Sequence, residues 1–197
     1  MTPMSTEGLS QALGDARRGD ERAIAVLYRA LNPPLLRYLR HHAGPVAEDL
    51  ASEVWISLAR RLRAFGGDDR ELRALMFTIA RRRVVDEHRR RGRRVTTAPL
   101  GDYDRPAGDS PEDAVVAGLT AQGAVEALAA HLPGDQAEIV LLRVLGDLDV
   151  GQVADIVGKS SGAVRVAQHR ALQRLRAVFD ERGLGGANAA TEGERSA

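Results

Sequence analysis

Apolar residues recur at helical spacing along most of this 197-residue chain. Between residues 49 and 65 they fall every third or fourth position, which gathers them on one face of a helix. This face consists of Leu50, Val54, Leu58, Leu62 and Phe65, with Trp55 at its edge. The opposite face carries Asp49, Ser52, Glu53 and Arg60, and also Ile56. An isoleucine among polar residues indicates either ordinary apolar exposure or a docking surface, and the pattern alone leaves both open.

A second amphipathic helix is expected over residues 70–91. The acidic turn Gly66-Gly67-Asp68-Asp69 precedes it, and acidic groups favour a helix N-terminus. Its expected buried face consists of Leu72, Leu75, Met76 and Ile79. Arg83 and Asp86 continue this face at three-residue spacing, which is typical of a partly buried ion pair. The following HRRRGRR (88–94) has nothing apolar to bury and suits phosphates or water.

Helix breakers and composition divide the chain. We expect breaks at Pro33-Pro34, Gly44-Pro45, Gly66-Gly67 and Pro133-Gly134. No stretch alternates apolar and polar residues for long enough to predict a strand. The stretch 95–115 contains three prolines and little periodicity, as in a linker. We therefore expect an all-α chain of two small helical domains, 10–94 and 116–182, joined by a flexible linker. Residues 1–10 and the tail 183–197 have little to bury, so we expect them to be frayed and disordered.

The second domain has the spacing of a helix-turn-helix. A short apolar helix is expected over 136–146, a second over 150–157, and a long one from there to about residue 182. Such a motif needs a small residue where two helices cross, a glycine at the turn and an apolar residue that seats the second helix. Ala154, Gly158 and Val164 stand at these offsets, and Ser160 or Ser161 is the expected N-cap.

The long helix presents two different faces. Its expected inward residues are Val164, Ala171, Leu172, Leu175, Val178 and Phe179. Its expected outward residues are Arg165, Val166, His169, Arg170 and Gln173. The outward set combines donors for guanine edges and phosphates with one apolar side chain for a thymine methyl group. This pattern favours DNA recognition over a plain helical hairpin with a solvated arginine face, which stays the alternative.

Charge is segregated although the formal net charge is only +1. Residues 81–94 hold eight arginines against Asp86 and Glu87. Residues 95–130 are acidic overall, and residues 159–176 hold Lys159 and four arginines with no acid. Two basic blocks separated by an acidic stretch indicate two surfaces that face a polyanion.

The sequence lacks the residues that several classes of function require. The chain has no cysteine, which excludes disulfides, thiolate catalysis and cysteine-ligated metals. No apolar run reaches the roughly 18–20 residues that span a bilayer, and the N-terminus lacks a signal core, so we expect a cytoplasmic protein without membrane insertion. The five histidines form no metal-ligand motif, and Asp86-Glu87-His88 is interpreted as charged helix surface. We expect no catalytic residues, no metal, no cofactor and no enzymatic activity.

The segments together resemble the extracytoplasmic-function (ECF) group of bacterial σ70-family initiation factors. In the first half the resemblance lies in LYRALNPPLLRYLR (27–40), AEDLASEVWISLARRLRAF (47–65) and LRALMFTIARRRVVDEHRRRGRR (72–94). In the second half it lies in HLPGDQAEIVLLRVLGDLDVGQVADIVGKSSGAVRVAQHRALQRLR (131–176). The resemblance implies a region 2-like domain that binds RNA polymerase and reads the −10 promoter element. It also implies a region 4-like domain that reads the −35 element and contacts the polymerase β flap.

The resemblance assigns residues to three surfaces. The helix that would dock on the β′ clamp helices of core polymerase presents Asp49, Ser52, Glu53 and Ile56. The implied −10 surface consists of Phe65, Gly66, Asp68, Asp69, Arg70, Arg81, Arg82, Arg83, Arg89 and Arg90. The implied −35 surface consists of Lys159, Ser161, Arg165, Val166, His169, Arg170, Arg174 and Arg176. An anti-sigma factor is a further implied partner.

Two other functions remain open. A helix-turn-helix regulator that acts on operators without polymerase would bind duplex DNA tightly by itself, usually as a dimer. A helical adaptor that binds no DNA would not need the arginine face at all.

Overall fold

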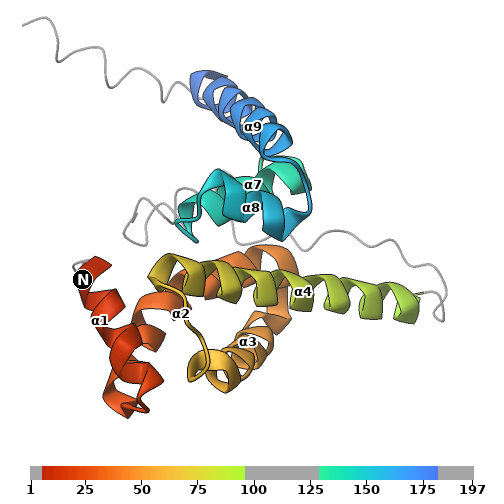
Figure 1. Cartoon of the computed structure of the whole chain (residues 1–197). Coiled ribbons are helices and arrows are strands. Elements are labelled where there is room, and N and C mark those ends of the chain that lie inside the picture. Colours follow the sequence, from red (N-terminus) through yellow and green to blue (C-terminus); the bar gives the residue numbers. More distant parts are fainter. Residues whose placement is uncertain (1–5, 96–128, 182–197) are drawn as a thin grey trace, which may run out of the picture.

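The computed structural model describes residues 6–95 and 129–181, all of whose regular elements are helices (Figure 1). The first unit contains α1 (Thr6–Arg17), α2 (Glu21–Ala43), the short 3₁₀ helix η1 (Gly44–Val46), α3 (Ala47–Leu62) and α4 (Asp69–Val95). The second unit contains α7 (Gly134–Val144), α8 (Val150–Val157) and α9 (Ser161–Glu181). The all-α expectation is confirmed, whereas almost all of the expected linker and the whole C-terminal tail lie outside the described residues.

The first helix begins earlier than the sequence predicted. Residues 6–10 belong to α1, and Leu9 and Leu13 are 2% exposed within the shared core. The frayed N-terminal stretch expected over residues 1–10 is therefore wrong for residues 6–10. Two leucines at four-residue spacing supply enough apolar surface to hold this short helix against α2.

The expected break at Pro33-Pro34 is also wrong, because both prolines lie inside the continuous helix α2. A proline in a helix interior costs about 3 kcal/mol. The helix continues because a stripe of buried leucines runs through this point, with Leu31, Leu35 and Leu39 at most 2% exposed. Its start is fixed by Asp20, whose Oδ1 accepts hydrogen bonds from the backbone N–H of Arg22 (2.8 Å) and Ala23 (3.3 Å).

Helices α3 and α4 complete the first unit. The expected buried stripe of α3 is confirmed, since Leu50, Val54, Leu58 and Leu62 are all buried. Along α4, Leu72, Met76 and Ile79 are buried as expected, and Leu75 is half-buried. The helix continues to Val95, so the basic block 81–94 lies on its C-terminal half.

The second unit is the expected helix-turn-helix. Gly158 ends α8 in the left-handed conformation (φ 69°, ψ 37°), while Ala154 and Val164 are buried where α8 and α9 meet. The side chains of Asp149 and Gln152 form a reciprocal cap on α8, and Ser160 Oγ accepts a hydrogen bond from the N–H of Ala163 at the start of α9. Leu172, expected on the inward face, is 46% exposed, whereas Ala171 and Leu175 are buried. The helical rotation places Leu172 at the edge of the buried face of α9 and not at its centre.

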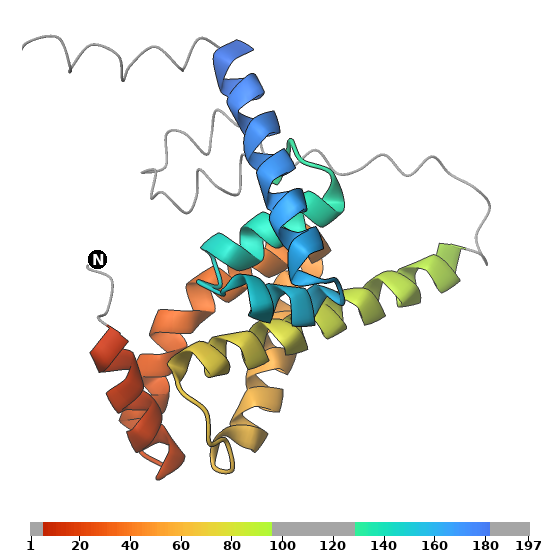
Figure 2. The same cartoon turned by 45° about the horizontal axis from the view of Figure 1, so that its top comes forward.

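The two units lie against each other. Helix α8 contacts both α4 and α9, so the helix-turn-helix rests on the longest helix of the first unit. Figures 1 and 2 both show α7 and α8 close to α4, while α9 extends away from the first unit. No helix within the described ranges is long and apolar enough to cross a membrane.

Candidate nucleic-acid and docking surfaces

The outer face of α3 has the character expected of a docking surface. Asp49, Ser52 and Glu53 are exposed, and Ile56 is 54% exposed in their midst. Ser52 Oγ donates a hydrogen bond to the carbonyl of Glu48, at 3.0 Å. The structure thus places all four residues of this group on one accessible helix face, with an apolar side chain among polar ones.

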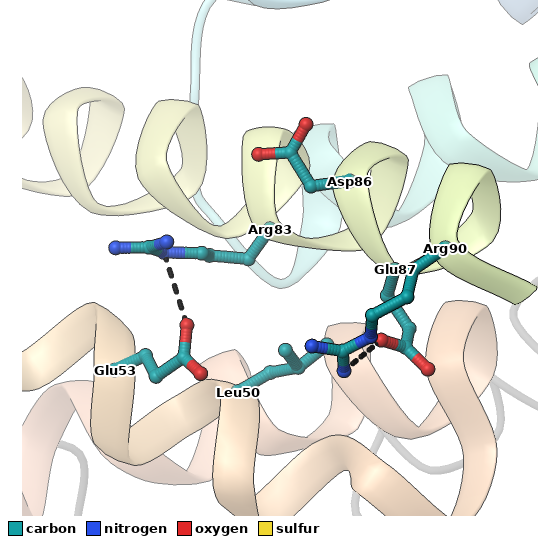
Figure 3. A pocket seen from close by; sticks show the side chains of 6 residues that line it. All are labelled: Leu50, Glu53, Arg83, Asp86, Glu87 and Arg90. Carbon is teal, nitrogen blue, oxygen red and sulfur yellow. Dashed lines mark ion pairs between the residues drawn. The ribbon is translucent and has the colours of Figure 1, made fainter.

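Glu53 is connected to the basic helix α4. Its carboxylate lies 3.3 Å from Arg83 Nε, and Arg83 Nη2 also donates to Ser57 Oγ at 3.3 Å. Figure 3 shows Arg83 reaching toward α3 while Asp86 points away from it. The expected Arg83–Asp86 ion pair is therefore wrong, because α3 offers Arg83 a carboxylate on its own side. Asp86 instead lies 3.9 Å from Arg89.

The loop before α4 is held by the protein's own hydrogen bonds. Asp68 Oδ1 accepts from the N–H of Glu71 at 2.8 Å, and Glu71 Oε2 accepts from the N–H of Asp68 at 2.9 Å. Asp69 is only 5% exposed and accepts a hydrogen bond from Ser10 Oγ at 2.9 Å. These carboxylates fix the start of α4, so Asp69 in particular holds the loop rather than facing solvent. Phe65 is half-buried, and Gly66 and Arg70 are exposed.

The arginines of α4 differ in how many ion pairs and hydrogen bonds they make. Arg81 Nε lies 2.9 Å from Glu138 Oε1 of the second unit, and Arg90 pairs with Glu87. Arg89 is exposed and only distantly paired with Asp86. Arg82 is exposed and makes no hydrogen bond or ion pair with any described residue. Between residues 81 and 91 of this helix, Arg82 is thus the one arginine whose guanidinium has no hydrogen bond or ion pair with a described residue.

The N-terminal part of α9 presents the expected basic face. Arg165, Val166, His169 and Arg170 are exposed, with half of Val166 accessible. Arg165 and Arg170 make no hydrogen bond or ion pair with described residues. Lys159 Nζ lies 3.2 Å from Asp135, Ser161 is half-buried, and Arg174 and Arg176 are exposed. The structure therefore brings Arg165, Val166, His169 and Arg170 together on the exposed side of α9, while the other four residues lie elsewhere on this helix and the turn before it.

Comparisons with known proteins fit both units. Residues 27–94 match the family described as Sigma-70 region 2, and residues 122–175 match Sigma-70, region 4. The ECF RNA polymerase sigma factor SigD of Mycobacterium tuberculosis is 35% identical over 187 residues, covering 88% of this chain and 84% of SigD. ShbA of Streptomyces griseus, also named an ECF RNA polymerase sigma factor, is 35% identical over 177 residues, covering 84% of this chain and 92% of ShbA.

This chain is an ECF sigma factor. Its fold is similar to that of CnrH, solved with the cytosolic domain of CnrY (TM-score 0.57, 21% identity, 88% of this chain and 98% of CnrH). It is also similar to RpoE of Bartonella quintana, solved with the anti-sigma factor NepR (TM-score 0.58, 20% identity, 80% of this chain and 96% of RpoE).

Besides Asp69, a second acid of this sigma factor is buried although the sequence analysis did not expect it. Glu87, interpreted as helix surface, is 6% exposed and accepts a hydrogen bond from Arg91 Nε at 2.8 Å beside its ion pair with Arg90. Burial acts to raise the pKa of Glu87, but the hydrogen bond from Arg91 and the charges of Arg90 and Arg91 outweigh it and lower that pKa. Arg90 and Arg91 follow Glu87 by three and four residues, a spacing that could have predicted these ion pairs.

Sequence reasoning also missed Arg17 of α1. Its guanidinium donates to the carbonyl of Gly67 and lies 5.4 Å from the centre of the Phe65 ring. The loop that carries the predicted −10 residues is thus positioned by a helix outside the matched region. No local pattern pointed to this contact, because the partners are 50 residues apart.

Within residues 6–95 and 129–181, no group of three or more histidines and carboxylates is placed to hold a metal ion. The pKa of His42 is lowered to about 3, first by burial and then by the charges of His41, His88 and Arg81. A histidine that stays neutral at physiological pH beside a tyrosine ring is typical of packing.

Proposed function

We propose that this sigma factor binds core RNA polymerase, places it at promoters through the −10 and −35 elements, and assists DNA melting, while polymerase performs the chemistry. The observation that carries the proposal is the exposed face of α9 on an intact helix-turn-helix. Four side chains suited to base edges, Arg165, Val166, His169 and Arg170, point outward there with no acidic neighbour on the helix from 159 to 179.

The −35 contacts follow from side-chain chemistry. Arg165 and Arg170 can each donate two hydrogen bonds to guanine O6 and N7, and Val166 suits a thymine methyl group. His169 adds a donor or acceptor at the same face. Lys159, Ser161, Arg174 and Arg176 flank this group and would bind phosphates, which fixes the helix in the groove without reading sequence.

The −10 contacts are proposed on α4 and the loop before it. Opening a duplex exposes bases whose unstacking costs a few kcal/mol, so a protein that captures them must offer a pocket and hydrogen bonds. The loop residues Phe65, Gly66, Asp68 and Arg70 are at least partly accessible and are held in place by Arg17 and the cap of α4. Arg81, Arg82, Arg83, Arg89 and Arg90 would follow the strand's phosphates along the helix.

Polymerase docking is proposed on the outer face of α3. Ile56 supplies an apolar centre, and Asp49 and Glu53 supply negative charge beside it. A partner helix with an apolar stripe and basic flanks, as proposed for the β′ clamp helices, complements this surface. The β flap, in turn, is the proposed polymerase contact of the second unit.

The proposal also includes a cytoplasmic location and an anti-sigma factor as a binding partner. CnrH and RpoE were each solved in complex with another protein, which for RpoE is an anti-sigma factor. An anti-sigma factor that covers α3, α9 or both would block polymerase docking or DNA reading.

Reconstituted transcription tests the function. Purified core polymerase, with and without the chain, is supplied with a library of random duplex fragments, and RNA 5′ ends are sequenced. The chain should create starts preceded by two recurring sequence blocks. Arg165→Ala should weaken the upstream block by on the order of tenfold to a hundredfold. Ile56→Asp should prevent co-purification with core polymerase, whereas Arg29→Ala, an exposed arginine of α2, should change neither.

The outcomes separate the alternatives. If core polymerase initiates no better with the chain than without it, the proposed function is wrong. Tight duplex binding by the chain alone would favour an operator-binding regulator. Full activity of both Arg165→Ala and His169→Ala would favour an adaptor that binds no DNA.

A further inference from the structure

The contact between the two units is built around one carboxylate. Glu138 of α7 has a side chain only 17% exposed. Its Oε1 accepts hydrogen bonds from Arg81 Nε at 2.9 Å and from the hydroxyl of Tyr38 at 3.2 Å. Tyr38 is fully buried, and burial together with Glu138 raises its pKa well above the ordinary value, so it remains a donor. A single acid of the second unit thus binds two elements of the first.

Close apolar packing surrounds this carboxylate. Phe77 of α4 is completely buried and meets the Tyr38 ring edge-on, with centroids 5.4 Å apart. A Cβ at Gly146, between α7 and α8, would lie 3.1 Å from the Phe77 ring and 2.6 Å from the carbonyl of Leu142. The absence of a side chain at Gly146 therefore lets the second unit approach the aromatic pair.

Two polar contacts extend the same surface along α4. Arg73 Nη1 lies 3.7 Å from Asp147, and Gln152 Nε2 donates to the carbonyl of Arg70 at 3.4 Å. Asp147 adopts a positive φ of 52°, a conformation uncommon outside glycine and asparagine or aspartate, and it directly follows Gly146. The turn between α7 and α8 is thus shaped to lie on the first unit.

The packed arrangement conflicts with reading a promoter at two places. Elements centred about 25 base pairs apart are separated by roughly 85 Å at 3.4 Å per base pair. Helix α8 contacts both α4 and α9. The start of α9 therefore lies within two or three helix diameters of α4, on the order of 30 Å. The two surfaces cannot reach both elements without separating.

We infer that α7 and the α7–α8 turn form a closing surface for α4, with Glu138 occupying Arg81 in place of a DNA phosphate. The inference rests on the proposed function for the role of Arg81, while the closure itself stands on the contacts. In the free chain this surface holds the two units together and withholds part of the −10 path. Polymerase, by binding each unit separately, supplies the free energy that opens it.

The closed form also explains why α9 stays accessible. Helix α9 extends away from the first unit (Figure 2), and Arg165 and Arg170 on it are exposed. Closure therefore occupies Arg81 of the first unit and keeps the two DNA-facing surfaces too close together. It leaves the −35 face itself exposed. A free chain should bind −35 duplex about as well whether it is closed or open.

Energy transfer between two dyes tests closure in the full-length free chain. The chain has no cysteine, so Arg29→Cys on α2 and Gln173→Cys on α9, both exposed, accept dyes selectively. Three further forms of this labelled chain are compared: Glu138→Arg, the same change with Arg81→Glu, and the control Asp155→Arg. Asp155 is an exposed acid of α8 that makes no hydrogen bond or ion pair with described residues, so its variant matches the charge change.

We expect high transfer in the unmodified labelled chain and in Asp155→Arg. Glu138→Arg places two guanidinium groups together and should lower transfer by at least half, and Arg81→Glu should restore most of it. Far-UV circular dichroism confirms that each variant is folded, and the milder Glu138→Gln should give an intermediate value. Equal transfer in Glu138→Arg and the unmodified chain, or low transfer in the unmodified chain, would overturn the inference.

Transcription separates this inference from the proposed function. A chain that closes in the dye experiment but gives no promoter-directed starts overturns the function and leaves closure standing. A chain that directs starts but shows no closed form overturns closure alone.

Discussion

Neighbouring acids on α4 have different roles at the residue scale. Asp86 and Glu87 are adjacent in sequence, yet Asp86 is exposed and Glu87 is nearly buried between two arginines. The carboxylate of Glu87 orders Arg90 and Arg91, and Arg91 in turn donates to the carbonyl of Ala43 at 3.1 Å. Glu87 therefore connects the basic helix to the end of α2.

Replacing Glu87 with alanine should destabilise the first unit. The change removes the nearly buried carboxylate that Arg90 and Arg91 share, and with it the charge-assisted hydrogen bond from Arg91 that ties α4 to the end of α2. We expect Glu87→Ala to lower the melting temperature by several degrees, as measured by differential scanning calorimetry. Asp86→Ala, which removes only a distant exposed pair, should melt within about a degree of the unmodified chain. Equal melting of the two variants would contradict the assigned role.

His42 should make the protein less stable in acid. Its pKa is about 3 in the folded chain, whereas an unfolded histidine binds a proton near pH 6.5. Between these values the unfolded state binds more protons, so the free energy of unfolding falls as pH is lowered. At about 1.4 kcal/mol per pKa unit, the contribution between pH 7 and pH 5 is at most roughly 2 kcal/mol.

Urea unfolding at pH 7 and pH 5 measures this contribution. His42→Gln has no proton to bind, so its stability should fall less between the two pH values than that of the unmodified chain. The exposed His169→Gln should keep the unmodified pH dependence. An unchanged pH dependence in His42→Gln would show that His42 does not carry the effect.

At the element scale, the turn between α8 and α9 depends on one glycine. Gly158 has φ 69° and ψ 37°, and nothing lies within 4 Å of an added Cβ. Gly158→Ala should therefore cost about 1 kcal/mol through backbone strain alone. Gly162→Ala, within α9 and in ordinary contact only with Ser160, should instead stabilise by roughly 0.5–1 kcal/mol. Opposite signs in chemical denaturation test this assignment, and a stabilising Gly158→Ala would refute it.

Local patterns predicted those elements whose stabilisation is local. The stripe of α3 and the offsets of Ala154, Gly158 and Val164 were visible in the sequence, because helical period and turn geometry act over a few residues. The prolines of α2 were misjudged because leucines on other turns compensate for them. Leu172 was misjudged because an approximate wheel cannot separate the edge of a buried face from its centre.

The candidate sites were predicted to a similar extent. The α9 face follows from one helix, and the structure places its residues together as expected. Arg81 pairs with Glu138 and Arg83 pairs with Glu53, and Arg17 lies over the ring of Phe65. In each case the partner is distant in sequence or outside the motif. Only the packing of separate helices brings them together, and no pattern within a single helix encodes it.

At the scale of the whole molecule, we expect the two basic surfaces to recognise a promoter only when they are held at one separation. We expect each small unit to bind DNA weakly by itself, and the two units held by one polymerase to act at high effective concentration. Arg83 and Glu53 bring the proposed −10 path and the proposed docking face into direct contact, so we expect polymerase binding and DNA binding to be coupled. Closure through Glu138 would keep the free chain from using both surfaces at once.

Promoter spacing tests this account most directly. Starting from a promoter selected in the reconstituted system, the distance between the two sequence blocks is changed one base pair at a time, and run-off RNA is quantified. Two base pairs shift one block by about 7 Å and roughly 70° around the helix. The account predicts a maximum at one spacing and a severalfold loss two base pairs to either side. Equal RNA yields at all spacings would contradict it.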